Sequence, residues 1–365
     1  MQNKIKNIEF LRVIGCLAII ILHFYGFLVK YISDISIYTH LRNMTSNGQK
    51  AVDLFFMLSG IFFAITLNTQ KSYSDFIKKK CIRLLPVLYW GTGLLFIVSL
   101  FGIVNFNLYS NILNLLMLGG IGLNYNGVAI DVFWYASTMF WILLFLFYSF
   151  KNFDKKYIKL IMAFAIFCCY SILIQAKGGK INSPSQYFYT FLKVGTLRGI
   201  GGIFLGYFIG DWYKNNLEKI KNFIPTLKEK IGITIIEGMC VFFIINNFFF
   251  RYAKEQEDMM FIVAFVICSL LFLINKGFIS QFLNKDIWSK LGVYTYSFYM
   301  THKIIIKILM GTVWKNNIQF IHLHPYLHVF YAFLSIFLLG IITYHFIEQP
   351  CAKYLKQKLF PKKDC

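Results

Sequence analysis

Acidic residues are scarce in this chain, where Asp and Glu occur 16 times among 365 residues against 37 Lys and Arg. Charged residues make up 15% of the sequence, whereas a soluble domain usually has about 25%. This shortage excludes a soluble enzyme held by one anchor. The 8 cysteines form no Cys-x-x-Cys pair and predict no disulfide framework. Three loosely spaced histidines, His322, His324 and His328, lack a Cys or carboxylate co-ligand, so no metal site is predicted.

The excess of basic residues gives a formal net charge of +21, which raises the question of nucleic-acid binding. No aromatic-basic motif of a nucleic-acid-binding module accompanies this charge. The basic residues stand in short loops between apolar runs, as the positive-inside rule describes for membrane proteins. The charge therefore predicts membrane orientation and attraction to anionic lipid headgroups, and no nucleic-acid partner.

Apolar runs are abundant, since 58% of the residues are hydrophobic and Phe alone occurs 41 times. A transmembrane helix needs about 17–25 residues. Runs near that length occur at 8–30, 51–67, 84–104, 130–150, 157–174, 196–213, 231–250, 259–275, 291–313 and 327–347. The sequence therefore predicts an all-α, polytopic transmembrane helical bundle of about ten spans. The segment 112–122 is short and Gly-rich, and we expect it to be re-entrant or interfacial.

Loop charges set the predicted orientation of the chain. One alternating set of loops contains 24 Lys and Arg and the opposite set contains 9, so the first set is predicted to be cytoplasmic. Both termini are then cytoplasmic. The first apolar run is too long for a signal peptide and is expected to remain as a span. We expect a transmembrane domain at 1–350 and a short basic cytoplasmic tail at 351–365.

The run 8–30 contains two ionisable residues, Arg12 and His23, eleven positions apart. Eleven residues are close to three helical turns, so both lie on one helix face, about 16 Å apart along the axis. Ionisable groups inside a span usually mark a function. His23 is either a general base or a structural histidine bonded between helices. Arg12 either contacts an anion or carbonyl, or pairs with Glu9.

A second stretch begins at Gly48 and places Asp53 at the start of an apolar run that ends in Ser59 and Gly60. Asp53 is a candidate to orient His23, as a carboxylate orients imidazole in a catalytic triad. The two small residues equally predict close helix packing.

A third stretch is the densest basic cluster of the chain, and it contains Lys78, Lys79, Lys80 and Arg83. We expect it to end at Pro86, where the third helix is predicted to begin. The cluster is either an orientation signal or a seat for a polyanionic donor, because several basic side chains can bind phosphates together.

Two polar stretches lie near the C-terminus. Tyr296, Tyr299 and His302 recur at a spacing of three and predict a partly polar face within the run 291–313. Glu348, at the end of the last run, is expected to cap a helix or to pair with a basic loop.

Together these stretches resemble the acyltransferase 3 family of integral-membrane acyltransferases. The resemblance covers nearly the whole chain in the right order. The matching blocks are Leu11-Arg12 with His23, Val52 to Phe56 with Ser59-Gly60, the basic run to Arg83 and Pro86, Tyr296-Ser297 with His302, and Phe346 to Pro350.

The resemblance implies O-acetylation, or other O-acylation, of a carbohydrate, with acetyl-CoA from the cytoplasm as the donor. By position, His23 is the catalytic histidine and Arg12 its partner. Arg83 is the second arginine of the family's cytoplasmic Arg-x-x-Arg element, whose first arginine is Lys80 here. Lysine keeps the charge but loses the bidentate fork of arginine. The family often has a glutamate after a tryptophan in a middle helix, and the comparable block at Trp134 has none.

The resemblance also sets the expected site and partners. We expect catalytic roles for His23, Arg12 and Asp53, donor binding by Lys78, Lys79, Lys80 and Arg83, and a substrate cavity lined by Ser59, Tyr296, His302 and Trp134. The expected partners are acetyl-CoA as co-substrate, a bacterial surface or lipid-linked glycan as acceptor, and membrane lipids, with no metal. The family's frequent esterase-like domain is not expected here, which favours a capsule, lipopolysaccharide or other lipid-linked sugar. The expected location is a bacterial cell membrane.

Transport is the competing function, because ten spans with buried charges also suit a glycan exporter or flippase. Such proteins often contain half-chain repeats and interrupted helices, and the sequence shows neither. A non-enzymatic membrane regulator is a third interpretation.

In the enzyme interpretation, His23 is predicted in the outer half of the membrane, whereas the donor acetyl-CoA comes from the cytoplasm. Either the thiol arm of CoA therefore reaches into the membrane as far as His23, or an acyl relay carries the acetyl group outward.

Overall fold

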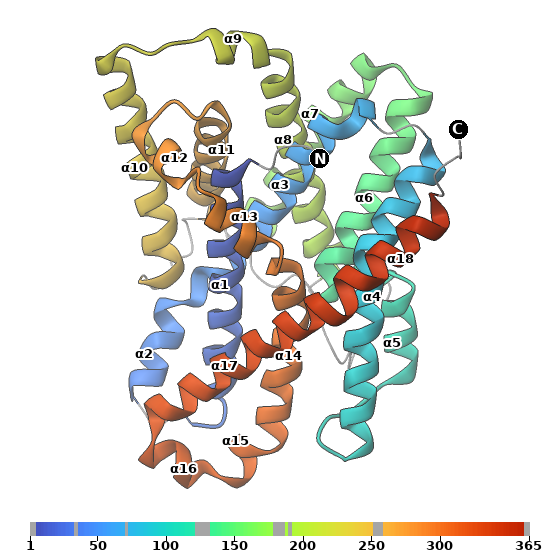
Figure 1. The fold of residues 1–365 in the computed structure, drawn as a ribbon, viewed down its shortest axis with the longest axis vertical. Coiled ribbons are helices and arrows are strands. Elements are labelled where there is room, and N and C mark those ends of the chain that lie inside the picture. Colours follow the sequence, from blue (N-terminus) through green and yellow to red (C-terminus); the bar gives the residue numbers. More distant parts are fainter. Residues whose placement is uncertain are drawn as a thin grey trace. The chain divides into compact units, whose positions relative to one another are not determined.

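The computed structural model describes residues 5–32, 36–69, 72–120, 132–177, 187–188, 192–250 and 258–360. Helices account for most of this described part (Figure 1). Its strands are a two-residue antiparallel pair, β1 (Tyr187–Phe188) and β2 (Leu192–Lys193). The predicted all-α fold class is therefore confirmed.

Each of the ten apolar runs that the sequence predicts as helices is helical over most of its described length, and residues 130–131 lie outside the described residues. The corresponding helices are α1 (Lys6–Leu28), α3 (Ala51–Thr66), α4 (Tyr73–Leu100), α6 (Phe133–Asn152), α7 (Lys155–Lys177), α8 (Val194–Asn215), α10 (Leu227–Phe249), α11 (Asp258–Ile274), α14 (Thr295–Gly311) and α17 (Pro325–Thr343). The shorter helices are α2 (Ser36–Met44), α5 (Leu108–Leu115), α9 (Leu217–Asn222), α12 (Phe278–Leu283), α13 (Asp286–Gly292), α15 (Val313–Asn316), α16 (Ile318–Leu323) and α18 (Gln349–Leu359). Short 3₁₀ helices occupy Ser46–Lys50 and Leu67–Thr69.

Seven segments of the described chain are long and apolar enough to cross a membrane. They are Lys6–Leu28, Tyr38–Thr69, Tyr73–Leu100, Phe133–Asn152, Lys155–Gln175, Leu227–Phe249 and Pro325–Leu359. A multi-pass membrane protein is thus supported. The number of spans beyond seven, the orientation of both termini and the re-entrant or interfacial placement of 112–122 stay predictions. Helix α5 ends within this last segment, at Leu115, and residues 121–122 lie outside the described residues.

The chain divides into two compact units. The first unit comprises Met1–Leu22, Asn43–Thr69 and Phe145–Thr295, and the second comprises His23–Arg42, Gln70–Leu144 and Tyr296–Cys365. Helix α1 contributes to both, so Arg12 belongs to the first unit and His23 to the second.

In the first unit, α3 packs closely on α8. A Cβ atom on Gly60 would collide with the carbonyl of Ile203, and one on Gly206 would collide with the carbonyl of Met57. Glycine at these positions therefore lets the two backbones touch, which is the usual role of small residues between membrane helices. The packing interpretation of Gly60 is confirmed.

In the second unit, the prediction that the third helix begins at Pro86 is wrong. Helix α4 begins at Tyr73, where the Ser72 side chain accepts a hydrogen bond from the Asp75 amide at 3.0 Å. A serine cap and an acidic residue in the first turn both favour a helix start. Pro86 lies inside the helix and removes only its own backbone donor. The basic cluster consequently lies on helical turns rather than in a loop.

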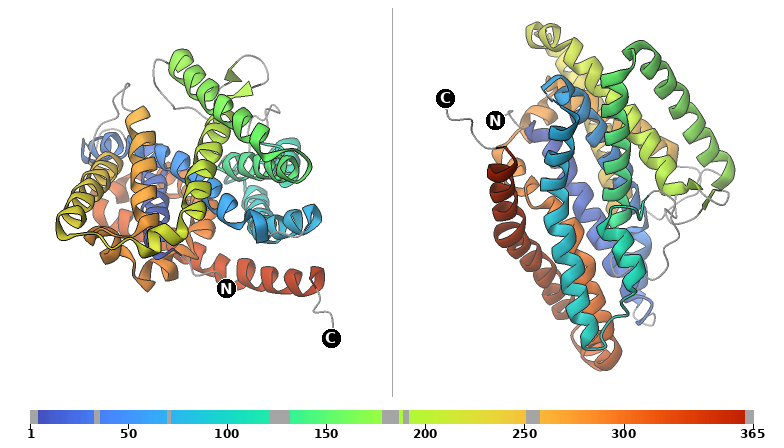
Figure 2. Two further views of the ribbon diagram at one scale, coloured as in Figure 1. Left: turned by 90° about the horizontal axis from the view of Figure 1, so that it is seen from above. Right: turned by 90° about the vertical axis from the view of Figure 1, so that its right-hand side faces the viewer.

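Helix α18 continues from α17 and packs against α4 in the second unit (Figure 2). Between α17 and α18, residues Tyr344–Glu348 form a π-helical turn just before Pro350. Proline has no N–H for the carbonyl four residues earlier, and local widening of the helix is one way to accommodate that loss. The described part of the expected tail, up to Phe360, is therefore mostly helical, and 361–365 lie outside the described residues.

Candidate functional site

His23 and His302 meet directly in the second unit. The Nδ1 atom of His23 lies 2.8 Å from the Nε2 atom of His302. The ring centroids are 5.1 Å apart and the ring planes differ by 12°. Since the centroid separation is about the nitrogen–nitrogen distance plus one radius of each ring, the rings meet edge to edge in nearly one plane. Such an arrangement aligns a nitrogen lone pair with an N–H group.

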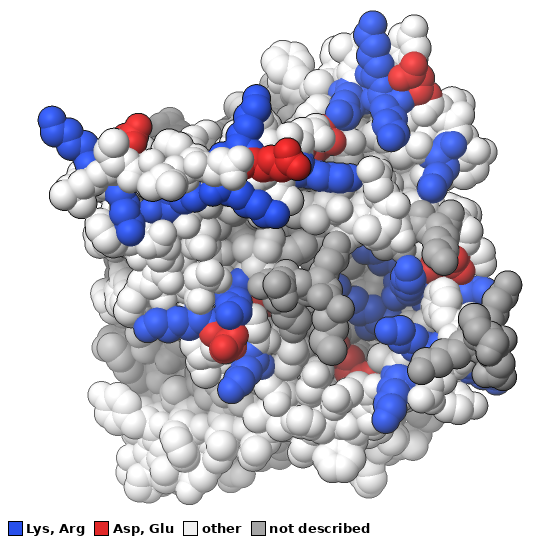
Figure 3. Space-filling view, turned by 45° about the horizontal axis from the view of Figure 1, so that its top comes forward, with Lys and Arg blue, Asp and Glu red and all other residues white. Residues whose placement is uncertain are grey.

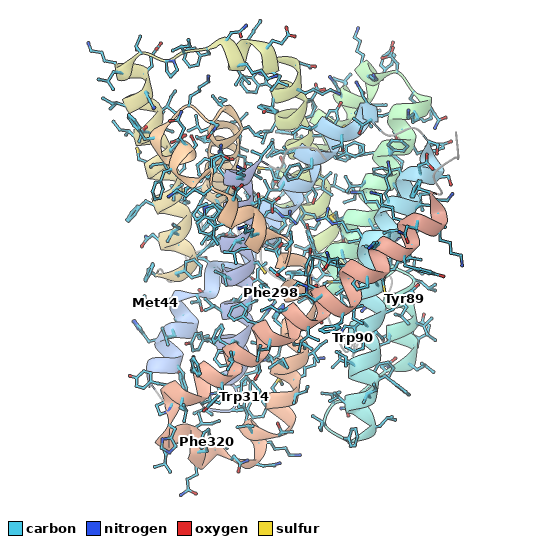
Figure 4. All side chains as sticks on the ribbon, viewed as in Figure 1. Met44, Tyr89, Trp90, Phe298, Trp314 and Phe320 are labelled. Carbon is cyan, nitrogen blue, oxygen red and sulfur yellow. The ribbon has the colours of Figure 1, made fainter. Side chains whose placement is uncertain are left out.

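His302 has a second contact on its other nitrogen. Its Nδ1 atom lies 3.2 Å from the carbonyl oxygen of Phe298, one turn earlier on α14. Phe298 is labelled in Figure 4. His302 is fully buried, whereas His23 is only partly buried. The pair therefore has one end fixed in the core and one end nearer the surface.

A lysine accompanies the histidine pair. Lys303 follows His302 on α14, is 4% exposed, and is an electrostatic neighbour of His23. Its ammonium lies 5.3 Å from the centroid of the Phe27 ring, within the range of a cation–π contact. A buried cation thus lies beside the imidazole that the sequence singles out, although the sequence analysis had not selected it.

The polar face predicted on the run 291–313 is present on α14. The Tyr296 hydroxyl donates to the carbonyl of Leu84 on α4 at 2.8 Å, and the Ser297 hydroxyl donates to Glu348 at 2.5 Å. The Tyr299 hydroxyl donates to the carbonyl of Val132 at 3.3 Å. These bonds fix α14 to its neighbours in the second unit. They show a structural role for Tyr296, while its expected place on the cavity wall stays a prediction.

The expected donor-binding residues lie along the first turns of α4. Lys78 and Lys79 lie 6.0 and 5.9 Å from the Phe360 ring after α18, and Lys80 lies 5.3 Å from the Phe76 ring. Arg83 is exposed. Figure 3 shows a face of the molecule on which Lys and Arg outnumber Asp and Glu. Lys79 is also exposed, so two of the four positions combine charge with access, and donor binding there stays a prediction.

Trp134 lies at the start of α6. Its carbonyl lies where a side chain on Gly120 would collide with it, so this backbone packs tightly against the segment after α5. A cavity-lining role for the Trp134 side chain is neither supported nor excluded by this contact.

Arg12 pairs with Glu9 in the first unit. Its guanidinium lies 3.1 Å from both carboxylate oxygens of Glu9. The pairing that the sequence offered as the structural alternative is therefore present. It neutralises Arg12 locally and leaves the catalytic role of Arg12 as a prediction.

Asp53 also has a partner in the first unit that the sequence analysis missed. Arg198 on α8 donates to the two carboxylate oxygens of Asp53 at 3.0 and 2.6 Å, and to the carbonyl of Gln49 at 3.1 Å. The side chains of Asp53 and Arg198 are only 2% and 1% exposed. The orienting bond that we expected Asp53 to make with His23 stays a prediction. The catalytic role of Asp53 stays a prediction without a contact that supports it.

A second buried ion pair joins Lys50 and Asp258, each 3% exposed. Lys50 also lies 4.2 Å from the Phe261 ring centroid. A separate contact involves Ser59 on α3. Its hydroxyl donates to the carbonyl of Phe55 at 2.8 Å, a bond within the same helix. This bond gives Ser59 a local structural role, and its expected cavity-lining role stays a prediction.

Two of the predicted site residues, His23 and His302, thus contact each other in the structure. Two others, Arg12 and Asp53, form ion pairs with Glu9 and Arg198. The missed residues are Arg198 and Lys303. A signal for both was present, because each is a cation within a largely apolar predicted span, where charge usually has a purpose.

The chain was compared with known proteins. A family model described as an acyltransferase domain matches residues 5–345. No curated protein and no solved structure matched the chain. The helical membrane fold and the buried histidine pair define a multi-pass membrane protein with a candidate proton-transfer site. The chain belongs to the acyltransferase 3 family, and the resemblance stated from its motifs is confirmed.

Proposed function

We propose that this protein is a membrane O-acetyltransferase that moves an acetyl group from acetyl-CoA to a hydroxyl of a bacterial surface or lipid-linked glycan. The observation that carries the proposal is the His23–His302 pair at 2.8 Å in the second unit. A half-buried imidazole with one nitrogen held in a polar contact suits a general base. Family membership supports the acyl-transfer class.

His23 would remove the proton of the acceptor hydroxyl. The hydroxyl oxygen would then attack the thioester carbonyl and form the new ester bond, while the carbon–sulfur bond breaks. The proton held by His23 would pass to the departing thiolate of CoA. No atom is left unbalanced, and no metal is needed for these steps.

Charge develops on the carbonyl oxygen during the attack, and a nearby cation lowers the energy of that state. Lys303 is well placed for this role because it is buried and is an electrostatic neighbour of His23. Arg12 is the candidate that the sequence offered, although its guanidinium is bonded to Glu9.

The CoA phosphates would bind the basic residues on the first turns of α4. Lys79 and Arg83 are one turn apart and both exposed, so they present two charges on one side of the helix. This location suits the predicted cytoplasmic side, where acetyl-CoA is found.

The test is acetyl transfer by the purified full-length protein in lipid vesicles, with radiolabelled acetyl-CoA and candidate glycans. We expect transfer without an ion gradient, and a loss of about 10²-fold or more in His23→Asn. The matched control is His324→Asn, because His324 is exposed. Glycan movement across the vesicle without acetylation would favour the exporter instead.

A further inference from the structure

We infer that His302 is a positioning residue that fixes the tautomer of His23, so that Nε2 of His23 is the basic nitrogen. The inference rests on the proposed function and goes beyond it, because it names the atom that accepts the proton and the residue that makes it basic. His302 was expected from the sequence only to line the cavity.

The argument starts at the buried end of the pair. The Phe298 carbonyl oxygen can only accept a hydrogen bond, so the Nδ1 atom of His302 at 3.2 Å carries the proton. A neutral imidazole with a proton on Nδ1 has its lone pair on Nε2. The Nε2 atom of His302 is therefore an acceptor.

The next step concerns His23. Its Nδ1 atom, 2.8 Å from this acceptor, must carry the proton of that hydrogen bond. The lone pair of neutral His23 then lies on Nε2. Within the described part of the chain, Nδ1 makes the only hydrogen bond of the His23 ring. Nε2 is left available to an acceptor hydroxyl, as expected for a base whose other nitrogen is held by an orienting group.

The charged and titratable groups around the pair favour the neutral form on which this assignment depends. Lys303 and His302 are the electrostatic neighbours of His23. An ammonium next to His23 repels an imidazolium there, so a neutral His23 joined to His302 by one proton is preferred. Tyr299, whose ring centroid is 6.0 Å from that of His302, uses its hydroxyl on the Val132 carbonyl.

Packing alone does not require this arrangement. An apolar residue of similar size would fill the same buried position without aligning a nitrogen lone pair with the His23 ring. A nitrogen–nitrogen distance of 2.8 Å with centroids 5.1 Å apart points one ring nitrogen at the other, as a hydrogen bond requires and face-to-face ring stacking does not.

Three substitutions separate positioning from packing. His302→Gln keeps an oxygen acceptor near the former Nε2 position, His302→Glu makes that acceptor anionic, and His302→Leu removes it. The full-length variants are compared with wild type in lipid vesicles by the pH dependence of kcat/KM for acetyl transfer, after a check of the folded fraction by size-exclusion chromatography.

We expect His302→Leu to lose about 10²-fold or more of kcat/KM, and His302→Gln to stay within about tenfold of wild type. In His302→Glu the acidic limb of the pH profile should move to higher pH, because a carboxylate favours the imidazolium form of His23. Equal losses in all three variants with an unmoved pH profile would indicate packing and overturn the inference. If His302→Leu does not fold, the Gln and Glu variants decide the question.

A spectroscopic measurement tests the tautomer without activity. In protein labelled with ¹⁵N-histidine, the His23 signals are identified by their disappearance in His23→Asn. We expect a protonated Nδ1 and an unprotonated Nε2 in wild type, and a shift toward protonated Nε2 in His302→Leu. The opposite tautomer in wild type overturns the inference. Full activity of His23→Asn would instead overturn the proposed function, so the two failures are distinguishable.

Discussion

The two units differ in how their buried polar groups are bonded. The first unit contains two ion pairs in which both side chains are buried, Asp53 with Arg198 and Lys50 with Asp258. The second unit contains a chain of hydrogen bonds that runs from Phe298 through His302 to His23, with Lys303 buried beside it. Ion pairs of this kind strongly resist the loss of either partner. A neutral imidazole, by contrast, has one lone pair that can accept a proton while its other nitrogen stays hydrogen-bonded.

This difference between ion pairs and a histidine pair bears on which buried groups can react with a substrate. A charged pair that is 1–2% exposed has to be broken before either member can act on a substrate, and breaking it costs about 3–5 kcal/mol. The histidine chain can accept a proton at its accessible end while its buried end stays bonded. Under the proposed function we therefore expect proton transfer in the second unit and a structural role for the two buried ion pairs of the first.

The largest expected effect comes from breaking a pair in the first unit. Asp53→Asn leaves Arg198 buried without its counter-charge, and we expect a loss of about 3–5 kcal/mol in the free energy of unfolding. Thermal unfolding in detergent and the yield of folded protein measure this loss.

The control is the double variant Asp53→Leu with Arg198→Met, which removes both charges and should recover most of the stability. If the double variant is stable and still transfers acetyl groups, the expected catalytic role of Asp53 is wrong. If it is stable and inactive, the separation of roles between the two units fails.

The helices of both units could be predicted from hydropathy, because each predicted apolar run is helical. Pro86 was misread, since a proline inside a long helix and one at its first turn follow similar apolar and basic patterns. The side-chain contacts between distant helices could not be predicted from the sequence. His23 and His302 are 279 positions apart, and Asp53 and Arg198 are 145 apart. Which faces of such distant helices meet depends on packing that one sequence does not reveal. The family, by contrast, followed from short motifs and their order.

The next expected effect tests the electrostatics of the second unit. Lys303→Met keeps a long side chain over Phe27 but removes the cation next to His23. If Lys303 stabilises the developing oxyanion, kcat should fall by about 10²-fold. Steady-state kinetics in vesicles measure it, with the exposed Lys315→Met as the control. An unchanged kcat would show that another group supplies the charge.

A smaller effect is expected where the first unit holds its helices together. Gly206→Ala places a methyl group against the Met57 carbonyl between α3 and α8, the helices that carry Asp53 and Arg198. We expect a loss of about 1–3 kcal/mol of stability from the forced separation. Gly93→Ala on α4 is the matched control, because a Cβ there meets no atom within 4 Å. It should be neutral or slightly stabilising, and equal losses in both variants would contradict the close-packing argument.

The smallest expected effect concerns donor binding in the second unit. Arg83→Gln removes an exposed charge on α4 that the proposal assigns to the CoA phosphates and not to the proton-transfer step. The KM for acetyl-CoA should therefore rise about tenfold while kcat changes little. The rise should shrink as salt is added, because ions screen exposed charges. A fall in kcat with an unchanged KM would place Arg83 in the chemical step and would remove the distinction between the basic turns of α4 and the histidine pair.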